Sequence, residues 1–510
     1  MAVAWNLENA AHLLRRAAFG GTNEEVQAFY EAHGSVAEAV ADLLSFSVST
    51  KKPPKGGSDF WRARLKQRQW WLKTILKSTS PRDAVREKMV LFWHGHLCSG
   101  FSKQPDSSYM GIQNGLFRRF AGGNFKDLVR EFHRDPANLN YLDGIQNYAS
   151  NDGHLVSANE NFARELMELF TLGISQLAAD GTNDPDLPNY SEDDVHQMAR
   201  ALTGWVTVEK GVGVWQPWAW DGGQYDDGGG SDHPGDPVTI FGVTNNNFRI
   251  GSADNLPDPS DDVLELVFGR LDAAGNHQAA MFLCRKLWTC FAYPAPAPGL
   301  KDLLQGFAAT LVANNWEVLP VLSAMFQHDE FYGERARTRT VKSPVDYVVG
   351  TLRMLGVRSI GKTLGDGGEL SDMLAAMGQA LFEPPNVAGW PGGRRWITTG
   401  TLVNRLDFAR RVAELDWGLS ALDLGQFGFP WGPAADPQTV LDRILARLGL
   451  DGATGGIALT AAQQAALLDF LTDGSTRATL DLSDAWTNDT AQLVRGTIAL
   501  ALQSAEAQIF

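Results

Sequence analysis

Cysteine is scarce in this sequence. Only Cys98, Cys284 and Cys290 occur among 510 residues, and no two of them form a CxxC pair. A small, odd number of cysteines without such pairs argues against a disulfide framework and against a thiolate zinc site. We therefore expect the three thiols to be packing residues.

Long apolar runs and an excess of basic residues are also missing. No stretch approaches the roughly 18 apolar residues that cross a bilayer, and the first residues, MAVAWNLENAAHLLRRAAFGG, lack the basic start and apolar core of a signal peptide. We expect no membrane span and a cytoplasmic location by default, with export beside a signal-bearing partner left open.

The formal net charge of −15 repels phosphate backbones, which argues against nucleic acid as a partner.

Several catalytic signatures are absent as well. The sequence contains no GxSxG motif, no Walker A motif, no GxGxxG before a helix and no HxxxH spacing. These absences remove the sequence support for a serine hydrolase of the nucleophile-elbow type, for a nucleotide-binding enzyme and for a helix-borne zinc site.

What is present favours a mainly α fold. The chain is 44% hydrophobic and 20% charged, which is typical of a globular protein, and apolar residues recur at helical spacing through most of it. The exception is 205–260, rich in Trp, Gly and Asp, where 238–241 alone has the pattern of a strand. We predict a multi-helix globular core with a loop-rich, minor-β insertion and a small C-terminal helical subdomain, divided as 1–204, 205–260, 261–415, a linker at 416–436, and 437–510.

The segment NENFARELMELFTLG at 159–173 is the most informative one. Phe162, Leu166, Leu169 and Phe170 fall on one stripe of a helix, and that stripe is expected to face the core.

Charged residues on the same helix form a second pattern. Glu160, Arg164 and Glu168 follow at i, i+4 and i+8 and would form a ridge on a largely buried helix. In one interpretation the ridge is a structural ladder of ion pairs. In the other, Glu165 or Glu168 is an acid or base whose pKa is set by Arg164 and by burial. The catalytic candidates are Glu160, Arg164, Glu165 and Glu168.

Two histidines mark the end of another expected helix, in REKMVLFWHGHLCSG at 86–100. On a helix, His94 and His96 would point roughly 200° apart, which disfavours joint metal binding unless the helix has already ended. They are nevertheless the first candidates for ligands of a divalent metal. The alternative is that each is a core or capping histidine with satisfied hydrogen bonds.

Glycine–tryptophan turns at 202–205 and 384–396 present large flat rings in a chain with 16 tryptophans. Apolar sugar faces lie on aromatic rings much as nucleobases do, so one interpretation is a sugar-stacking groove. The other is that the rings close the core beneath loops. The candidates for substrate binding are Asn161, Trp205, Trp390, Arg395 and Trp396.

Taken together, these segments resemble the domain-of-unknown-function 1800 family. The resemblance rests on HLLRRAAFGGT at 12–22, VREKMVLFWHGHL at 85–97, the block at 159–173, YSEDDVHQMARALTGW at 190–205, VKSPVDYVVGTLRMLG at 341–356 and MGQALFEPPNVAGWPGGRRW at 377–396. It implies a bacterial protein of a commonly exported kind, often found beside a partner of the domain-of-unknown-function 1501 family, and it carries over no activity. One departure is Pro237, which stands where the family pattern has a lysine.

Three functions remain open from the sequence. The first is an enzyme, a hydrolase that cleaves a polysaccharide or glycan through buried carboxylates supported by Arg and His. The second is a non-catalytic scaffold or binding partner of a domain-of-unknown-function 1501 family protein. The third is a metal-dependent enzyme that uses His94 and His96.

Overall fold

The computed structural model describes residues 3–54, 60–78, 80–147, 158–203, 205–208, 212–215, 237–249, 260–357, 368–414, 424–453, 456–483 and 489–510. Helices dominate these residues, and the strands form two-stranded antiparallel sheets. The predicted mainly α fold is confirmed.

The first half of the chain is largely helical. Its helices are α1 (Leu7–Ala18), α2 (Asn23–Glu31), α3 (Val36–Leu43), α4 (Phe60–Leu76), α5 (Pro81–His96), α6 (Ser108–Arg119), α7 (Phe125–His133), α8 (Pro136–Tyr141), α9 (Asn161–Glu165) and α10 (Glu192–Ala201), with short 3₁₀ turns at Phe101–Lys103 and Gly144–Gln146. A π-helical turn, Leu166–Thr171, continues α9 directly.

The second half is helical as well. It contains α11 (Ser260–Gly269), α12 (Gln278–Phe291), α13 (Leu300–Ala313), α14 (Val318–Gln327), α15 (Asp329–Tyr332), α16 (Glu334–Thr338), α17 (Pro344–Met354), α18 (Gly368–Ala376), α19 (Thr399–Glu414), α20 (Pro437–Leu448), α21 (Ala461–Leu471) and α22 (Asp489–Gln503), with 3₁₀ turns at Gly393–Trp396, Leu424–Phe427 and Glu506–Gln508.

The strands pair as β1 (Ser175–Leu177) with β2 (Asn183–Pro188), β3 (Trp205–Val208) with β4 (Val212–Trp215), and β5 (Pro237–Ile240) with β6 (Val243–Arg249). The strand expected at 238–241 is confirmed as β5. The strands β3, β4 and β6 lie within the minor-β insertion predicted at 205–260, although no bounds were predicted for them, and the prediction missed β1 and β2. For β2, Asp and Pro dominate a largely exposed segment that has no alternating apolar pattern.

Local capping signals define several helix starts. Ser80 precedes Pro81 at the start of α5 and accepts a hydrogen bond from the backbone N–H of Asp83. Thr22 and Ser191 form capping boxes with Glu25 and Asp194. Each cap satisfies backbone donors that have no partner inside the helix, so these boundaries follow from neighbouring residues alone.

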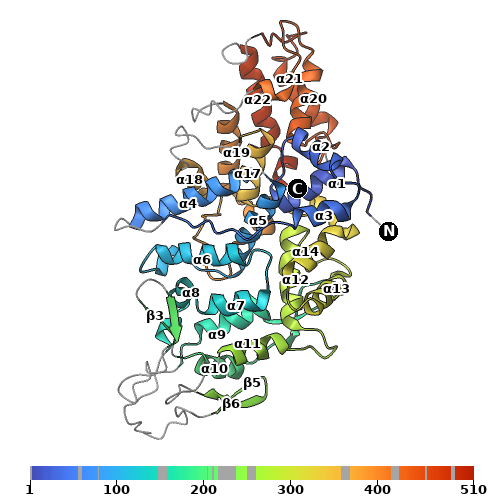
Figure 1. Ribbon diagram of the computed structural model, residues 1–510. Helices are drawn as coiled ribbons and strands as arrows, with labels where there is room; N and C mark the ends of the chain where they lie inside the picture. The colour runs from blue at the N-terminus through green and yellow to red at the C-terminus, as the bar shows by residue number, and fades with distance from the viewer. Residues whose placement is uncertain are drawn as a thin grey trace.

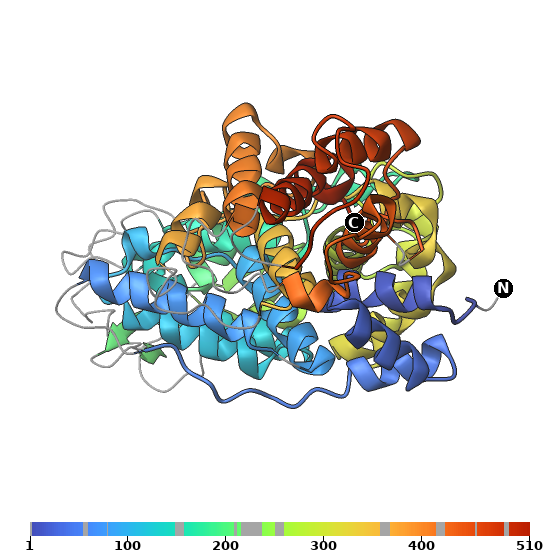
Figure 2. The same ribbon diagram turned by 90° about the horizontal axis from the view of Figure 1, so that it is seen from above.

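The buried apolar side chains form one continuous cluster that includes Leu13, Met89, Leu287, Val348 and Ile498. Figure 1 shows α20, α21 and α22 at one end near α1 and α2, and α10 with β5 and β6 at the other. The view from above (Figure 2) shows α4 extending away from α1–α3. The five-part division of the chain stays a prediction, and the described part of the expected linker contributes Phe427 and Phe429 to the core.

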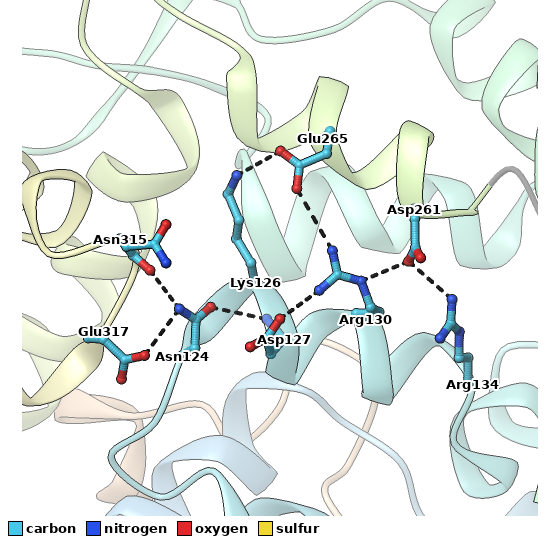
Figure 3. A network of polar contacts seen from close by, with 9 residues as sticks. All are labelled: Asn124, Lys126, Asp127, Arg130, Arg134, Asp261, Glu265, Asn315 and Glu317. Atoms are coloured by element: carbon cyan, nitrogen blue, oxygen red, sulfur yellow. Dashed lines mark hydrogen bonds and ion pairs between the residues drawn. The ribbon is translucent and has the colours of Figure 1, made fainter. Parts of the chain in front are cut away.

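Ion pairs join α7 to α11 on the surface (Figure 3). Arg130 contacts Asp261 at 2.7 Å and Asp127 at 2.6 Å, and Lys126 contacts Glu265 at 2.8 Å.

Across the described ranges, no helix has the length and apolar character needed to cross a membrane.

Candidate functional site

The last turn of α5 is the point where the parts of the candidate site meet. A β-carbon on Gly95 would lie 3.2 Å from Cε3 of Trp390. A β-carbon on Gly389 would overlap the carbonyl oxygen of Gly95 and lie 3.2 Å from Sγ of Cys98. The loop at 386–396 therefore packs directly on the helix end, and its approach to the carbonyl oxygen of Gly95 requires glycine at 389.

A cavity of about 280 Å³ opens beside this contact. It lies between α5, α12, the start of α17 and the loop at 386–396. Its charged side chains are Lys88, Lys286 and Asp346, and Trp390 and Trp396 contribute aromatic surface. Residues Thr289, Ala388 and Pro391, which also line it, are exposed and mark its mouth.

The two histidines at the end of α5 have separate surroundings. His94 is enclosed by aromatic rings, with ring centroids 5.4 Å from both Trp71 and Trp390. His96 stacks on Phe92, and its Nε2 lies 3.0 Å from the carbonyl oxygen of Phe170. Burial lowers the pKa of each imidazole to about 3, so both rings are neutral at physiological pH.

The helix α5 includes both histidines, so they point in different directions as the spacing predicts. Among the residues that the structure describes, no group of three or more His, Cys, Asp or Glu side chains could hold a metal ion. The role of His94 and His96 as metal ligands stays a prediction.

Glu165, the last residue of α9, and Glu168, in the π-helical turn that follows, form a pair of carboxylates. Burial, followed by the negative charge of Glu168, raises the pKa of Glu165 to about 7. No hydrogen bond to Glu165 is present in the described part of the chain. Glu168 accepts a hydrogen bond of 3.2 Å from the hydroxyl of Tyr190. The two acids therefore sit in different environments, three residues apart.

The charged ridge expected on this helix is only half formed. Arg164 contacts Glu160 at 3.1 Å, as i, i+4 spacing predicts, but its other carboxylate is Glu192 of α10 at 2.8 Å. Glu168 does not continue the ladder because the π-helical turn starts at Leu166, and a wider turn rotates later residues away from the i+4 position.

The expectation that the ridge is buried is wrong. Side chains of Glu160 and Arg164 are 37% and 33% exposed, because α9 packs on the core through Phe162 and Ala163 only on its opposite face. His196 of α10 reaches the same surface, where its Nδ1 lies 3.2 Å from Glu160. The contacts of Glu160 and Arg164 fit a structural ion-pair cluster between α9 and α10.

The substrate-binding candidates do not converge on one place. Trp390 and Trp396 line the cavity, and Arg395 between them is exposed to solvent. Asn161 donates a hydrogen bond of 2.9 Å to Asp143. Trp205 is buried and donates to the hydroxyl of Ser260 at 3.1 Å, so its ring packs inside the fold in the way the second interpretation describes.

Cys98 lies just beyond the last turn of α5, where its thiol donates to the carbonyl oxygens of His94 and Gly95. Burial raises the pKa of its thiol to about 12, Lys286 opposes that shift and Glu165 adds to it. The thiol therefore lies within the electrostatic reach of both Lys286 on the cavity side and Glu165 on the α9 side. The prediction that this cysteine is a packing residue agrees with its complete burial.

The sequence reasoning missed Lys286 and the pair formed by Lys88 and Asp346. Lys88 Nζ lies 2.6 Å from Oδ1 of Asp346, and both side chains are almost fully buried. Lys88 and Asp346 stand inside the segments 85–97 and 341–356 that were already singled out. Lys286 had a weaker signal, as one of two adjacent cations, with Arg285, in the largely apolar helix QAAMFLCRKLWTCF.

Comparisons with known proteins add the family and nothing on activity. No match was found among curated proteins or among solved structures. The family model described as "Protein of unknown function (DUF1800)" matches residues 12–509, which is essentially the whole chain. The chain belongs to the DUF1800 family.

Proposed function

We propose that this protein is a hydrolase that cleaves a glycan by acid–base catalysis, with Glu165 as the general acid. The observation that carries the proposal is the unequal pair of carboxylates on one helix. Glu165 is half-buried without a hydrogen-bond partner among the described residues, and Glu168 is held by Tyr190.

Glycoside hydrolysis uses two carboxyl groups in different protonation states. A carboxyl whose pKa is raised by burial stays protonated near neutral pH, as the raised pKa of Glu165 allows. It transfers that proton to the glycosidic oxygen as the bond to the anomeric carbon breaks. The negative charge of Glu168 stabilises the positive charge that develops on the sugar ring. A water molecule then forms a bond from its oxygen to the anomeric carbon, and the proton it loses returns to the carboxylate of Glu165.

The nearby cavity supports a sugar as the substrate. Trp390 and Trp396 line a space of about 280 Å³ beside α5, and aromatic rings offer an apolar surface for the flat face of a pyranose. Glu165 does not line this cavity, and the charges of Glu165 and Lys286 both act on the buried thiol of Cys98. The π-helical turn that follows Glu165 is also a feature that occurs often at functional sites.

The test is turnover on a panel of polysaccharides, measured as newly formed reducing ends. We expect Glu165→Gln to lower kcat by about 10²- to 10⁴-fold, and Glu168→Gln to lower it as well. Wild-type activity should fall as the pH rises through about 7, because Glu165 then loses the proton it donates.

Glu192→Gln is the matched control. This acid lies on the neighbouring helix α10 and contacts Arg164, but it is exposed and lies outside the carboxylate pair. Its replacement should leave kcat unchanged. Full turnover by Glu165→Gln would refute the proposal. Absence of cleavage across the whole panel would favour the alternative of a binding partner of a domain-of-unknown-function 1501 family protein.

A further inference from the structure

The cavity beside α5 contains a cation that no acid compensates. Lys88 and Asp346 neutralise each other at 2.6 Å, and Ser343 donates a second hydrogen bond to Asp346 at 2.9 Å. Lys286 makes neither an ion pair nor a hydrogen bond within the described part of the chain. Its Nζ lies 5.1 Å from the centroid of the Phe282 ring.

This lysine is also desolvated. Burial, followed by the charge of Arg285, lowers the pKa of Lys286. Lys286 is partly buried, and a partly desolvated cation without a counter-ion costs free energy that an anionic ligand would offset. The charged side chains around the cavity thus leave one positive charge for a ligand to neutralise.

Two hydrogen-bond donors at the cavity are unused. The indole Nε1 of Trp390 is buried without a partner. Gln379 accepts from the backbone N–H of Val345 through its Oε1, at 2.9 Å, which leaves its Nε2 as a donor without an acceptor in the described ranges. Both residues line the cavity.

One hydrogen-bond acceptor is unused as well. His96 is almost fully buried, and its Nε2 donates to the carbonyl oxygen of Phe170, since a carbonyl oxygen can only accept. Because the ring is neutral, its Nδ1 is a lone-pair acceptor, and this buried atom has no partner. A hydroxyl group is the kind of donor that would satisfy it.

We propose that this cavity binds a sugar acid, with the ligand carboxylate on Lys286. A hexuronate residue offers a carboxylate for Lys286, hydroxyl oxygens for Trp390 and Gln379, a hydroxyl donor for His96 and an apolar ring face for the tryptophans. The volume of about 280 Å³ is at the lower end of small-molecule sites and fits one such unit.

The binding site stands independently of catalysis. If a sugar acid binds here and the protein is a hydrolase, the substrate is an acidic glycan. This assignment of the substrate rests on the proposed function. Binding and turnover are measured separately, so failure of one does not hide the other. Glu165→Gln should still bind the sugar acid, because Glu165 does not line the cavity.

The experiment is calorimetric titration of the full chain with D-glucuronate and, separately, with D-glucose. We expect D-glucuronate to bind at least about tenfold more tightly, since a charge-assisted hydrogen bond is roughly twice as strong as a neutral one. Lys286→Met should remove this preference and bind both sugars equally weakly. Lys286→Arg, which keeps the charge, should restore part of it.

Arg285→Met is the matched control. It removes a positive charge from the adjacent position of α12, but Arg285 contacts Asn183 at 2.6 Å instead of lining the cavity. Its affinity for D-glucuronate should stay at the wild-type value. Equal binding of the two sugars by the wild type, or unchanged D-glucuronate affinity in a folded Lys286→Met variant, would overturn the proposal. Acetate binding as tightly as D-glucuronate would overturn the assignment of a sugar ligand.

Discussion

Gly389 lies against the last turn of α5 so closely that its missing side chain makes room for the carbonyl group of Gly95. Its φ of +86° is also in the left-handed region, which favours glycine. This contact holds the loop at 386–396 on the end of α5 and so positions Trp390 over the cavity. The site therefore depends on a glycine at 389, far in the sequence from the helix on which it packs.

The first prediction concerns this contact. Gly389→Ala should lower the free energy of unfolding by about 2 kcal/mol or more, because steric overlap adds to the strain of a positive φ. Gly299→Ala is the control, since Gly299 lies in the left-handed region with a φ of +73° and a ψ of 7° but has no atom within 4 Å of a β-carbon. It should cost only about 1 kcal/mol. Urea denaturation measures both, and equal losses would contradict the packing argument.

The second prediction concerns the buried ion pair between α5 and α6. Arg118 donates to both carboxylate oxygens of Glu87, at 2.5 and 2.8 Å, and both side chains are fully buried. Arg118→Met should destabilise the protein by about 3–5 kcal/mol, because it leaves a buried carboxylate without this partner. Replacing Glu87 with Leu in the same chain should recover part of the loss. A double mutant no more stable than Arg118→Met would argue against this explanation.

The third prediction concerns the ion pairs between α7 and α11 in Figure 3. Arg130 is partly exposed and its partners Asp127 and Asp261 are about half exposed. Arg130→Met should therefore cost about 1 kcal/mol or less, and less again in 1 M salt. Denaturation at low and high salt measures the effect. A large loss that salt does not reduce would show that these pairs are shielded from solvent.

The fourth prediction concerns the pH dependence of stability at Glu165. Burial raises the pKa of this carboxyl to about 7 from an ordinary 4.5. A carboxyl with a raised pKa makes its full contribution to the stability of the folded protein when the pH is below its ordinary pKa. It loses that contribution as the pH rises through about 7. Glu165→Gln, which cannot ionise, should therefore gain stability relative to the wild type between pH 5 and pH 8. After allowance for solvent screening, the gain is roughly 1 kcal/mol.

The pH dependence of stability at Glu192 should have the opposite sign from that at Glu165. The hydrogen bonds of Glu192 to Arg164 lower the pKa of its carboxyl, so its stabilisation is present above the ordinary pKa and is lost as the pH falls through the lowered value. Glu192→Gln should thus be less stable than the wild type near neutral pH, and the difference should disappear in acid. If both variants responded to pH with the same sign, the assignment of environments would be wrong.

Features that depend on neighbouring residues were determined by the sequence. The pairing of Glu160 with Arg164 follows from i, i+4 spacing, and the divergence of His94 and His96 follows from the helix angle. The helical periodicity of most of the chain likewise determines a mainly α fold. These outcomes need only the geometry of a single helix.

Features that join distant segments were decided by the tertiary structure. Lys286, Trp390 and Asp346 line the same cavity only because α5, α12, α17 and the loop at 386–396 pack together. The environment of Glu165 depends on how α9 lies against its neighbours, and Glu168 leaves the expected ridge because the helix widens at Leu166. Burial and charge balance are properties of the packed chain, so spacing along one helix cannot specify them.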